Sequence, residues 1–245
     1  MRLQGKIALV TGAARRVGKA VAMALAQRGA KIVLHYNRSK KEAQRLAQDI
    51  EASFGREVLL AKADLNQPRQ IERMAEIIMR EWGGVHVLVN NASIYEKNAF
   101  GKTTVEDWDS HLNTNLRAPF FLSQTFGPVM KKAGEGKIIN LVDWAAYRPY
   151  VDYIPYCVSK AGLLCLNTAL AKALAPEVQV NAVLPGPVLL PEHYTPKQRA
   201  GVEAATLLKR IGSPEDVAQA VLFLIEGSDF ITGANLTVDG GRLIA

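Results

Sequence analysis

Residues 7–18 read IALVTGAARRVG, and this stretch decides the fold. Its first five residues form an apolar, β-prone run, and a turn that contains Gly12 follows directly. Beyond the turn, apolar residues recur at the spacing of one face of an amphipathic helix: Val17, Ala20, Val21, Ala24 and Leu25. The order of strand, glycine turn and helix predicts an anion site, because the N–H groups and the positive dipole end at the start of such a helix bind a pyrophosphate.

The same alternation continues along the chain. Further apolar, β-prone runs predict strands over 31–36, 58–61, 85–89, 138–142, 178–184 and 236–238. Helical spacing predicts helices over 40–52, 68–80, 105–130, 156–174 and 214–224. This pattern predicts a single α/β domain over 1–245, a doubly wound Rossmann-type parallel sheet with helices on both faces. Residues 185–209, which hold four prolines, lack the pattern and are expected to form a substrate lid.

The composition is that of an ordinary globular protein. Of the 245 residues, 49% are hydrophobic and 22% are charged, which argues against disorder. The two cysteines, Cys157 and Cys165, lie eight residues apart on one predicted helix, too far to form a disulfide. No apolar run approaches the ~20 residues that cross a bilayer, and Arg15 and Arg16 interrupt the first apolar stretch too early for a signal peptide. We therefore expect a cytoplasmic protein without a membrane partner.

The net charge of +7 is unevenly distributed. Residues 1–41 contain ten of the 30 lysines and arginines and none of the 23 acidic residues, so the rest of the chain is slightly acidic. A nucleic-acid binder is one interpretation of a basic chain, and it predicts an affinity that falls steeply with salt. Charge confined to residues 1–41, which include the turn over 11–18, favours a small anionic ligand instead. The histidines show no metal-ligand spacing, and no metal site is expected at His35, His86, His111 or His193.

The residues after the second predicted strand indicate which dinucleotide binds. An NAD site expects an acidic residue here to accept hydrogen bonds from the ribose hydroxyls, and none occurs before Glu42. Asn37, Arg38 and Ser39 offer neutral and charged donors, which suit a 2′-phosphate. The sequence therefore predicts NADP(H). Two alternatives stay open. The glycine turn over 11–18 could be an ordinary strand-to-helix turn that binds no phosphate, and Arg38 could be a solvated surface residue that binds no ligand.

Tyr156 and Lys160 lie four residues apart, on one face of the predicted helix over 156–174. A phenol with a pKa of about 10 is a poor acid at neutral pH. An ammonium group one turn away, aided by an oxidised nicotinamide, stabilises the phenolate, so we expect Lys160 to help lower the pKa of Tyr156 and to make it a usable general acid. This pattern alone is common on helices, so its meaning depends on the motifs around it.

Several further motifs follow in a fixed order. Asn90-Asn91-Ala92 comes after a strand, Asn115 lies inside the long predicted helix, and Pro185-Gly186 follows a later strand. With the turn over 11–18 and with Tyr156 and Lys160, they resemble the classical short-chain dehydrogenase/reductase family over essentially the whole chain. The resemblance implies that Tyr156 is the general acid, that Lys160 is its partner and a ribose ligand, and that Asn115 orders a water for proton relay. It also implies a homotetramer.

The turn, the basic segment and the resemblance together define the expected cofactor site. Gly12 permits the tight turn, and Gly18 permits close packing of the helix. The resemblance adds an adenine contact at Asp64 and Leu65. The full expected set is Gly12, Arg16, Val17, Gly18, Asn37, Arg38, Ser39, Asp64, Leu65, Asn91, Ala92, Ser93, Tyr156, Lys160, Pro185, Gly186 and Val188.

Three departures from the common family pattern narrow the subgroup. Arg16 replaces the middle glycine of the turn, Ser93 replaces the glycine after Asn-Asn-Ala, and Asp143 replaces the catalytic serine thirteen residues before the tyrosine. With the run HYNRS at 35–39, they resemble pteridine reductases and the related bacterial dihydrofolate and dihydromonapterin reductases. That resemblance implies that Tyr95 stacks on a pterin. The expected substrate contacts are Arg16, Ser93, Tyr95, Asp143 and Tyr156, and Trp144, Tyr147, Tyr150 and Tyr153 are candidates to line the same flat pocket.

A chemical argument agrees with this subgroup. A ketone reductase stabilises a developing alkoxide with a serine hydroxyl, and an ionised Asp143 would repel that charge. A C=N bond takes up a proton on nitrogen, which a nearby carboxyl group favours or supplies. The sequence thus predicts an NADPH-dependent reductase of a pterin-type substrate with Asp143, Tyr156, Lys160 and Asn115 as its catalytic residues.

Four alternatives remain open at this point. Asp143 could merely cap a turn, the enzyme could reduce carbonyl or 3-ketoacyl substrates, and the chain could bind NADPH without turning it over. Leu190 stands where the family commonly has a threonine that holds the nicotinamide amide, so the orientation of the nicotinamide is also open.

Overall fold

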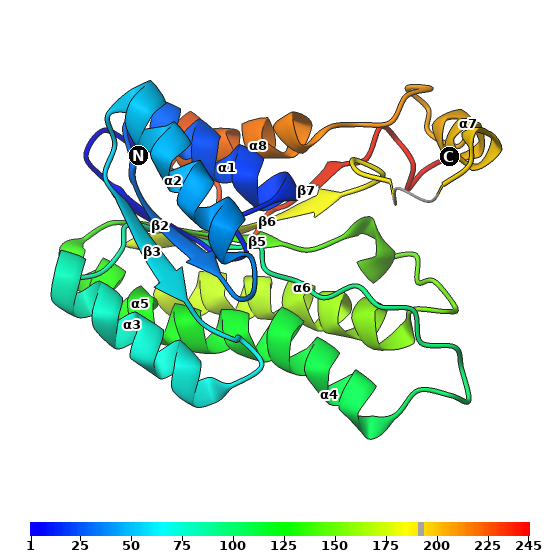
Figure 1. Ribbon diagram of the computed structural model, residues 1–245, viewed down its shortest axis with the longest axis horizontal. Helices are drawn as coiled ribbons and strands as arrows, with labels where there is room; N and C mark the ends of the chain where they lie inside the picture. Colours follow the sequence, from blue (N-terminus) through cyan, green and yellow to red (C-terminus); the bar gives the residue numbers. More distant parts are fainter. Residues whose placement is uncertain (191–193) are drawn as a thin grey trace.

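The computed structural model describes residues 1–190 and 194–245 (Figure 1). Over these residues, seven parallel strands form one sheet in the order β3-β2-β1-β4-β5-β6-β7. The strands are β1 (Ile7–Val10), β2 (Lys31–Tyr36), β3 (Val58–Lys62), β4 (Val87–Asn90), β5 (Gly136–Leu141), β6 (Val178–Pro185) and β7 (Asn235–Val238). The chain order reverses between β1 and β4, and in such sheets ligands bind at the carboxyl ends of the strands beside the reversal.

Helices cover both faces of the sheet (Figure 1). One layer holds α1 (Arg16–Gln27), α2 (Lys40–Phe54) and α8 (Pro214–Leu222), and the other holds α3 (Pro68–Trp82), α4 (Val105–Leu112), α5 (Ala118–Ala133) and α6 (Ile154–Leu174). Side chains of β1 alternate between the layers, because Ala8 and Val10 pack toward α1 and Leu9 packs toward α3 and α5. The predicted doubly wound α/β fold is confirmed.

The predicted helix over 105–130 is helical throughout but is not α-helical throughout. α4 ends at Leu112, a π-helical turn occupies Asn113–Arg117, and α5 follows. The cause is visible in the sequence, since Pro119 has no N–H to donate to the carbonyl of Asn115 four residues earlier. Apolar periodicity alone did not reveal this break.

The predicted lid over 185–209 is less irregular than expected. It contains α7 (Pro196–Ala204), which begins at a capping box formed by Thr195 and Gln198 with a proline at the first helical position. The stretch Thr-Pro-x-Gln signalled this start in the sequence. The part of the predicted lid over 191–193 lies outside the described residues, and His193 lies there too.

By length and composition alone, α6 could cross a membrane, since it has 21 apolar-rich residues. Its side chains Leu163, Leu170 and Leu174 are buried in the core instead, and it also buries the polar groups of Lys160 and Asn167. These contacts are those of a helix that packs against the sheet in a covering layer.

Candidate active site

The candidate site lies where β5 ends and α6 begins. Asp143 follows β5 and stands at the start of a short 3₁₀ turn over Trp144–Ala146. Tyr156 and Lys160 lie one turn apart near the start of α6, and both are buried. The structure therefore brings together a carboxyl, a phenol and an ammonium group at the carboxyl ends of the strands.

The carboxylate of Asp143 has a partner on each oxygen. The hydroxyl of Tyr156 donates to Oδ2 at 2.7 Å, and the N–H of Ala145 donates to Oδ1 at 2.7 Å. The sequence left open whether Asp143 caps a turn or acts on Tyr156. In the structure it does both, because it caps the 3₁₀ turn and also contacts the phenol. The backbone bond fixes the carboxylate in the orientation that presents Oδ2 to Tyr156.

The electrostatics of this pair differ from the sequence expectation. Burial and the adjacent carboxylate of Asp143 hold the pKa of Tyr156 well above its usual value. Burial also raises the pKa of Asp143 above its usual range. Asp143 contacts the hydroxyl directly, while the Lys160 ammonium lies 5.7 Å from the ring centroid and does not offset its effect. The lowering of the Tyr156 pKa by Lys160 together with an oxidised nicotinamide stays a prediction.

A hydrogen bond to the end of β5 fixes Lys160 next to the ring of Tyr156. Its Nζ donates to the carbonyl of Leu141 at 2.8 Å, and the side chain is fully buried. Burial lowers the pKa of Lys160 to about 8, an effect that Asp143 partly offsets. The ammonium therefore stays the predominant form at neutral pH and supplies the positive charge of the site.

Asn115 holds the segment that carries Tyr95. Its Oδ1 accepts from the N–H of Ile94 at 2.9 Å, and its Nδ2 donates to the carbonyl of Ile94 at 3.1 Å and to Oγ of Ser159 at 3.0 Å. The side chain is thus engaged with protein groups. The predicted role of Asn115 in ordering a relay water stays a prediction.

Three tyrosines form an aromatic cluster beside Tyr156. Tyr95 stacks on Tyr153 with ring centroids 4.3 Å apart and meets Tyr156 edge-on at 4.7 Å. Tyr150 meets Tyr153 edge-on at 6.0 Å. Tyr95 is 49% exposed, so part of its ring is open to a ligand. The backbone fixes this stack, because residues 98 and 153 form a parallel bridge.

The other candidate aromatic residues lie differently. Trp144 is buried between Tyr150 and Arg242. Its ring centroid lies 5.6 Å from that of Tyr150 and 5.2 Å from the guanidinium carbon of Arg242, so Trp144 packs against the cluster. Tyr147 lies apart and accepts a hydrogen bond from Asn235. Ser93 is exposed, and its hydroxyl donates to the carbonyl of Ile94 at 3.3 Å.

The turn after β1 is tight at Gly12 and closely packed at Gly18, as the sequence predicted. Gly12 takes a φ of +62°, and a Cβ on Gly18 would overlap the carbonyl oxygen of Gly12. Arg16 takes a φ of +56° at the position of the missing glycine, which costs a non-glycine residue roughly 1 kcal/mol. Its side chain is exposed at the start of α1.

Two polar residues fix this turn to the end of β4. Oγ1 of Thr11 accepts from the N–H groups of Asn91 and Ala92, each at 2.9 Å, and Nδ2 of Asn91 donates to the carbonyl of Thr11 at 2.7 Å. Sequence reasoning missed Thr11, although a hydroxyl residue at the end of a strand beside a glycine was the available signal. The ends of β1 and β4 therefore form one rigid edge.

A model of the family described as enoyl-(acyl carrier protein) reductase matches residues 12–242. The 3-oxoacyl-[acyl-carrier-protein] reductase FabG of Thermotoga maritima is 35% identical over 248 residues, which span all of both chains. A short-chain type dehydrogenase/reductase of Picea abies is 30% identical and covers 98% of this chain and 93% of its own. The chain belongs to the short-chain dehydrogenase/reductase family.

Solved structures of this family give two further likenesses. FolM alternative dihydrofolate reductase 1 from Brucella suis, in complex with NADP, has a TM-score of 0.91 and 30% identity and covers all of this chain and 97% of its own. A blue fluorescent protein from a metagenomic library, in complex with NADPH, has a TM-score of 0.88, 34% identity and 99% coverage of both chains. Both complexes agree with the cofactor predicted from Arg38.

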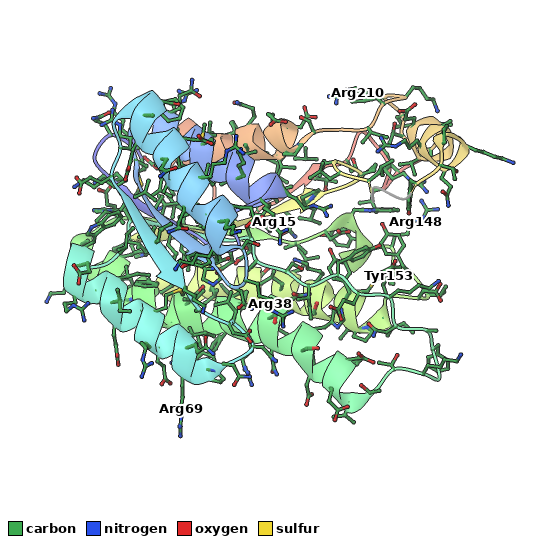
Figure 2. The ribbon with its side chains drawn as sticks, in the orientation of Figure 1. Arg15, Arg38, Arg69, Arg148, Tyr153 and Arg210 are labelled. Carbon is green, nitrogen blue, oxygen red and sulfur yellow. The ribbon has the colours of Figure 1, made fainter. Side chains whose placement is uncertain are left out.

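The expected 2′-phosphate residues of this short-chain dehydrogenase/reductase lie beyond β2. Asn37 and Arg38 are exposed, and Ser39 precedes α2. In Figure 2, Arg15 and Arg38 both lie between the two helical layers, beside the carboxyl ends of β1 and β2. Arg15 pairs with Glu42 at 3.6 Å, which partly neutralises it. The exposed guanidinium of Arg38, at the same edge of the sheet as the glycine turn, suits the 2′-phosphate of NADP(H).

The remaining expected cofactor residues lie at the ends of β3 and β6. Asp64 is half-buried, and Leu65 is buried. After β6, a Cβ on Gly186 would overlap Asp239, and the N–H of Val188 donates to the carbonyl of Gly186 at 2.8 Å. Close packing therefore determines the chain path after β6.

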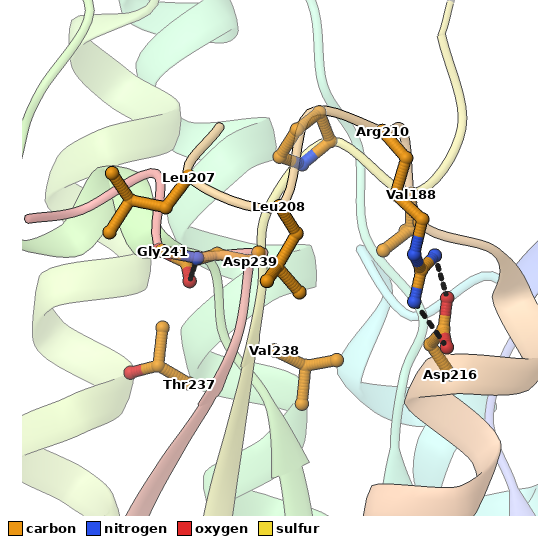
Figure 3. A pocket seen from close by; sticks show the side chains of 12 residues that line it. Val188, Leu207, Leu208, Arg210, Asp216, Thr237, Val238, Asp239 and Gly241 are labelled. Atoms are coloured by element: carbon orange, nitrogen blue, oxygen red, sulfur yellow. Dashed lines mark hydrogen bonds and ion pairs between the residues drawn. The ribbon is translucent and has the colours of Figure 1, made fainter. Parts of the chain in front are cut away.

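A cavity of about 390 Å³ borders this segment (Figure 3). Val188, Leu207 and Leu208 line its apolar side, and the ion pair between Arg210 and Asp216, at 3.1 Å, lies on its wall. None of the four candidate catalytic residues, at positions 115, 143, 156 and 160, lines it.

Proposed function

We propose that the chain is an NADPH-dependent reductase of a pterin-type substrate. The observation that carries the proposal is the hydrogen bond from Tyr156 to Asp143, at the position where family members that reduce ketones have a serine. A carboxylate there repels a developing alkoxide, whereas a ring nitrogen that gains a proton is stabilised by it. The FolM likeness supports the same substrate class.

The cofactor would be held by the turn around Gly12 and Gly18, by Arg38 at a 2′-phosphate, and by Lys160 at a ribose. When bound, it supplies a hydride. Arg16 at the turn would add positive charge next to the pyrophosphate, and the part of Tyr95 that is open would stack on the pterin ring.

The proton that accompanies hydride transfer would come from the pair of Tyr156 and Asp143. The hydroxyl proton of Tyr156 lies in the 2.7 Å hydrogen bond to Oδ2 of Asp143, and burial raises the pKa of both groups, so each holds a proton to a higher pH than it usually does. A raised carboxyl pKa brings Asp143 closer to the working pH of a general acid. The ammonium of Lys160 stabilises the negative charge that the pair acquires after proton transfer.

A second candidate function is reduction of 3-ketoacyl thioesters. It is favoured by the FabG relatives, of which the Escherichia coli protein is 36% identical over 245 residues and 98% of both chains. Asp143 argues against it, because no hydroxyl donor stands in its place.

Oxidation of NADPH distinguishes the two functions. We expect wild-type kcat/KM to be higher for dihydrobiopterin, dihydromonapterin or dihydrofolate than for an acetoacetyl thioester, and Asp143→Ser to lower the pterin value and raise the thioester value. A wild type that prefers the thioester would favour the second candidate. NADPH binding without turnover of any of these substrates would favour a non-catalytic sensor.

The other expectations for this chain stay predictions. They are a homotetramer, a cytoplasmic location and a lid over 185–209, the segment that includes α7.

A further inference from the structure

His35 lies on β2 and is 2% exposed, yet the predicted cofactor role of the run at 35–39 uses only its last three residues. The N–H of Gly12 donates to Nδ1 of His35 at 2.9 Å, and Nε2 lies 3.1 Å from the carbonyl oxygen of Ala63. These partners define the tautomer, because Nδ1 accepts and so carries no hydrogen, while Nε2 carries the proton and donates it to Ala63.

The backbone of His35 contacts the same turn. The N–H of Ala13 donates to the carbonyl of His35 at 2.9 Å, so two successive N–H groups of the turn are bonded to one residue. One imidazole thereby joins the ends of three neighbouring strands, β1, β2 and β3. Gly12 itself takes a left-handed φ of +62°, with its carbonyl against Gly18.

We propose that His35 is a positioning residue for the cofactor, which holds the pyrophosphate turn in its binding conformation through the Gly12 bond as the neutral Nε2–H tautomer. This proposal rests on the proposed NADP(H) cofactor and is independent of the proposed substrate. Burial lowers the pKa of His35 to about 4, which agrees with a neutral ring at physiological pH.

The chain contains a matched control at the other end of β1. Nδ1 of His86 accepts from the N–H of Ile7 at 3.1 Å, which is the same kind of bond far from the turn. If histidine bonds to β1 act only through fold stability, loss of either ring will have the same effect on cofactor binding. If His35 positions the turn, only its own loss will weaken binding.

Calorimetric titration with NADP⁺ and thermal unfolding without cofactor separate these roles. His35→Asn retains an acceptor near the position of Nδ1, His35→Gln retains only a group near Nε2, and His35→Leu retains neither. We expect His35→Asn to keep Kd within about threefold of wild type, and His35→Gln and His35→Leu to raise it about tenfold or more, because the N–H of Gly12 loses its acceptor. His86→Leu should lower the Tm without changing Kd.

Three results would overturn the proposal. They are equal Kd values for wild type and His35→Leu, an asparagine variant as weak as the leucine variant, and a loss of affinity in His86→Leu equal to that in His35→Leu. Nitrogen-15 spectra of the wild type test the tautomer without any variant, and an Nδ1–H tautomer or an imidazolium at pH 7 would also overturn it. Normal NADP⁺ binding by wild type keeps the cofactor assignment intact in each of these cases.

Discussion

The hydroxyl of Tyr156 donates a 2.7 Å hydrogen bond to Oδ2 of Asp143, thirteen residues earlier in the chain. The two groups come from different elements, since one lies on α6 and the other follows β5. Because the bond joins the two groups into one proton-holding unit, changes at either residue are expected to affect the same step.

Tyr156→Phe removes the proton donor and keeps the ring. We expect kcat to fall about 100-fold or more, with the Kd for NADP⁺ unchanged, because the bond from Lys160 to the carbonyl of Leu141 does not involve the hydroxyl. Steady-state assays and calorimetry measure the two quantities. Tyr147→Phe is the control, since its hydroxyl lies outside the cluster. A loss of cofactor binding in Tyr156→Phe would contradict a role confined to proton transfer.

Tyr95→Ala removes a half-exposed ring that stacks on Tyr153 and is the proposed platform for the pterin. We expect the KM for a pterin to rise up to about tenfold, and Tyr95→Phe to behave like wild type, because stacking needs the ring and not its hydroxyl. Phe100→Ala, on an exposed part of the same loop, is the control. An unchanged KM in Tyr95→Ala would show that the pterin does not bind against this ring.

Arg38→Ala tests the 2′-phosphate. We expect kcat/KM to fall about tenfold or more with NADPH and to stay constant with NADH, because only NADPH offers a phosphate to the guanidinium. Arg28→Ala removes a charge from the same basic segment but is exposed and paired with Glu226 at 3.5 Å, so it should change neither value. A wild type that prefers NADH would contradict the assignment.

The stability of the protein should depend on pH through His35. The pKa of His35 is about 4 in the folded protein, against 6.5 without the burial that lowers it. Folding therefore disfavours the proton, so the contribution is complete above pH 6.5 and is lost as the pH falls toward 4. The shift corresponds to about 3 kcal/mol. Urea unfolding at pH 7 and pH 4 should show a smaller loss for His35→Asn than for wild type. An equal loss in both proteins would contradict the buried neutral ring.

The strands could be predicted from the sequence because each is a buried apolar run with turn-forming or polar residues at its ends. The predicted range 31–36 matches β2, and most other boundaries differ by one or two residues. The π-helical turn was missed because apolar spacing continues through it, and only Pro119 marks the break. α7 was missed because its apolar face is weak, with no buried residue, and only its cap is distinctive.

The candidate site was predictable as a set of residues but not as a set of interactions. Spacing put Tyr156 and Lys160 on one face of a helix, whereas the contact that dominates the pKa of Tyr156 comes from Asp143 across a loop. The two bonds of the His35 ring likewise join separate strands. Such contacts depend on tertiary packing, which local patterns do not contain.

At Arg16 the backbone conformation and the proposed binding role favour different residues. Its left-handed backbone would suit glycine without strain, so Arg16→Gly should make the apo protein more stable by roughly 1 kcal/mol. A sequence optimised for stability alone would have glycine here. The arginine therefore marks a position at which the protein is less stable than its own backbone allows, and a thermostabilising redesign that ignored ligands would remove this charge first.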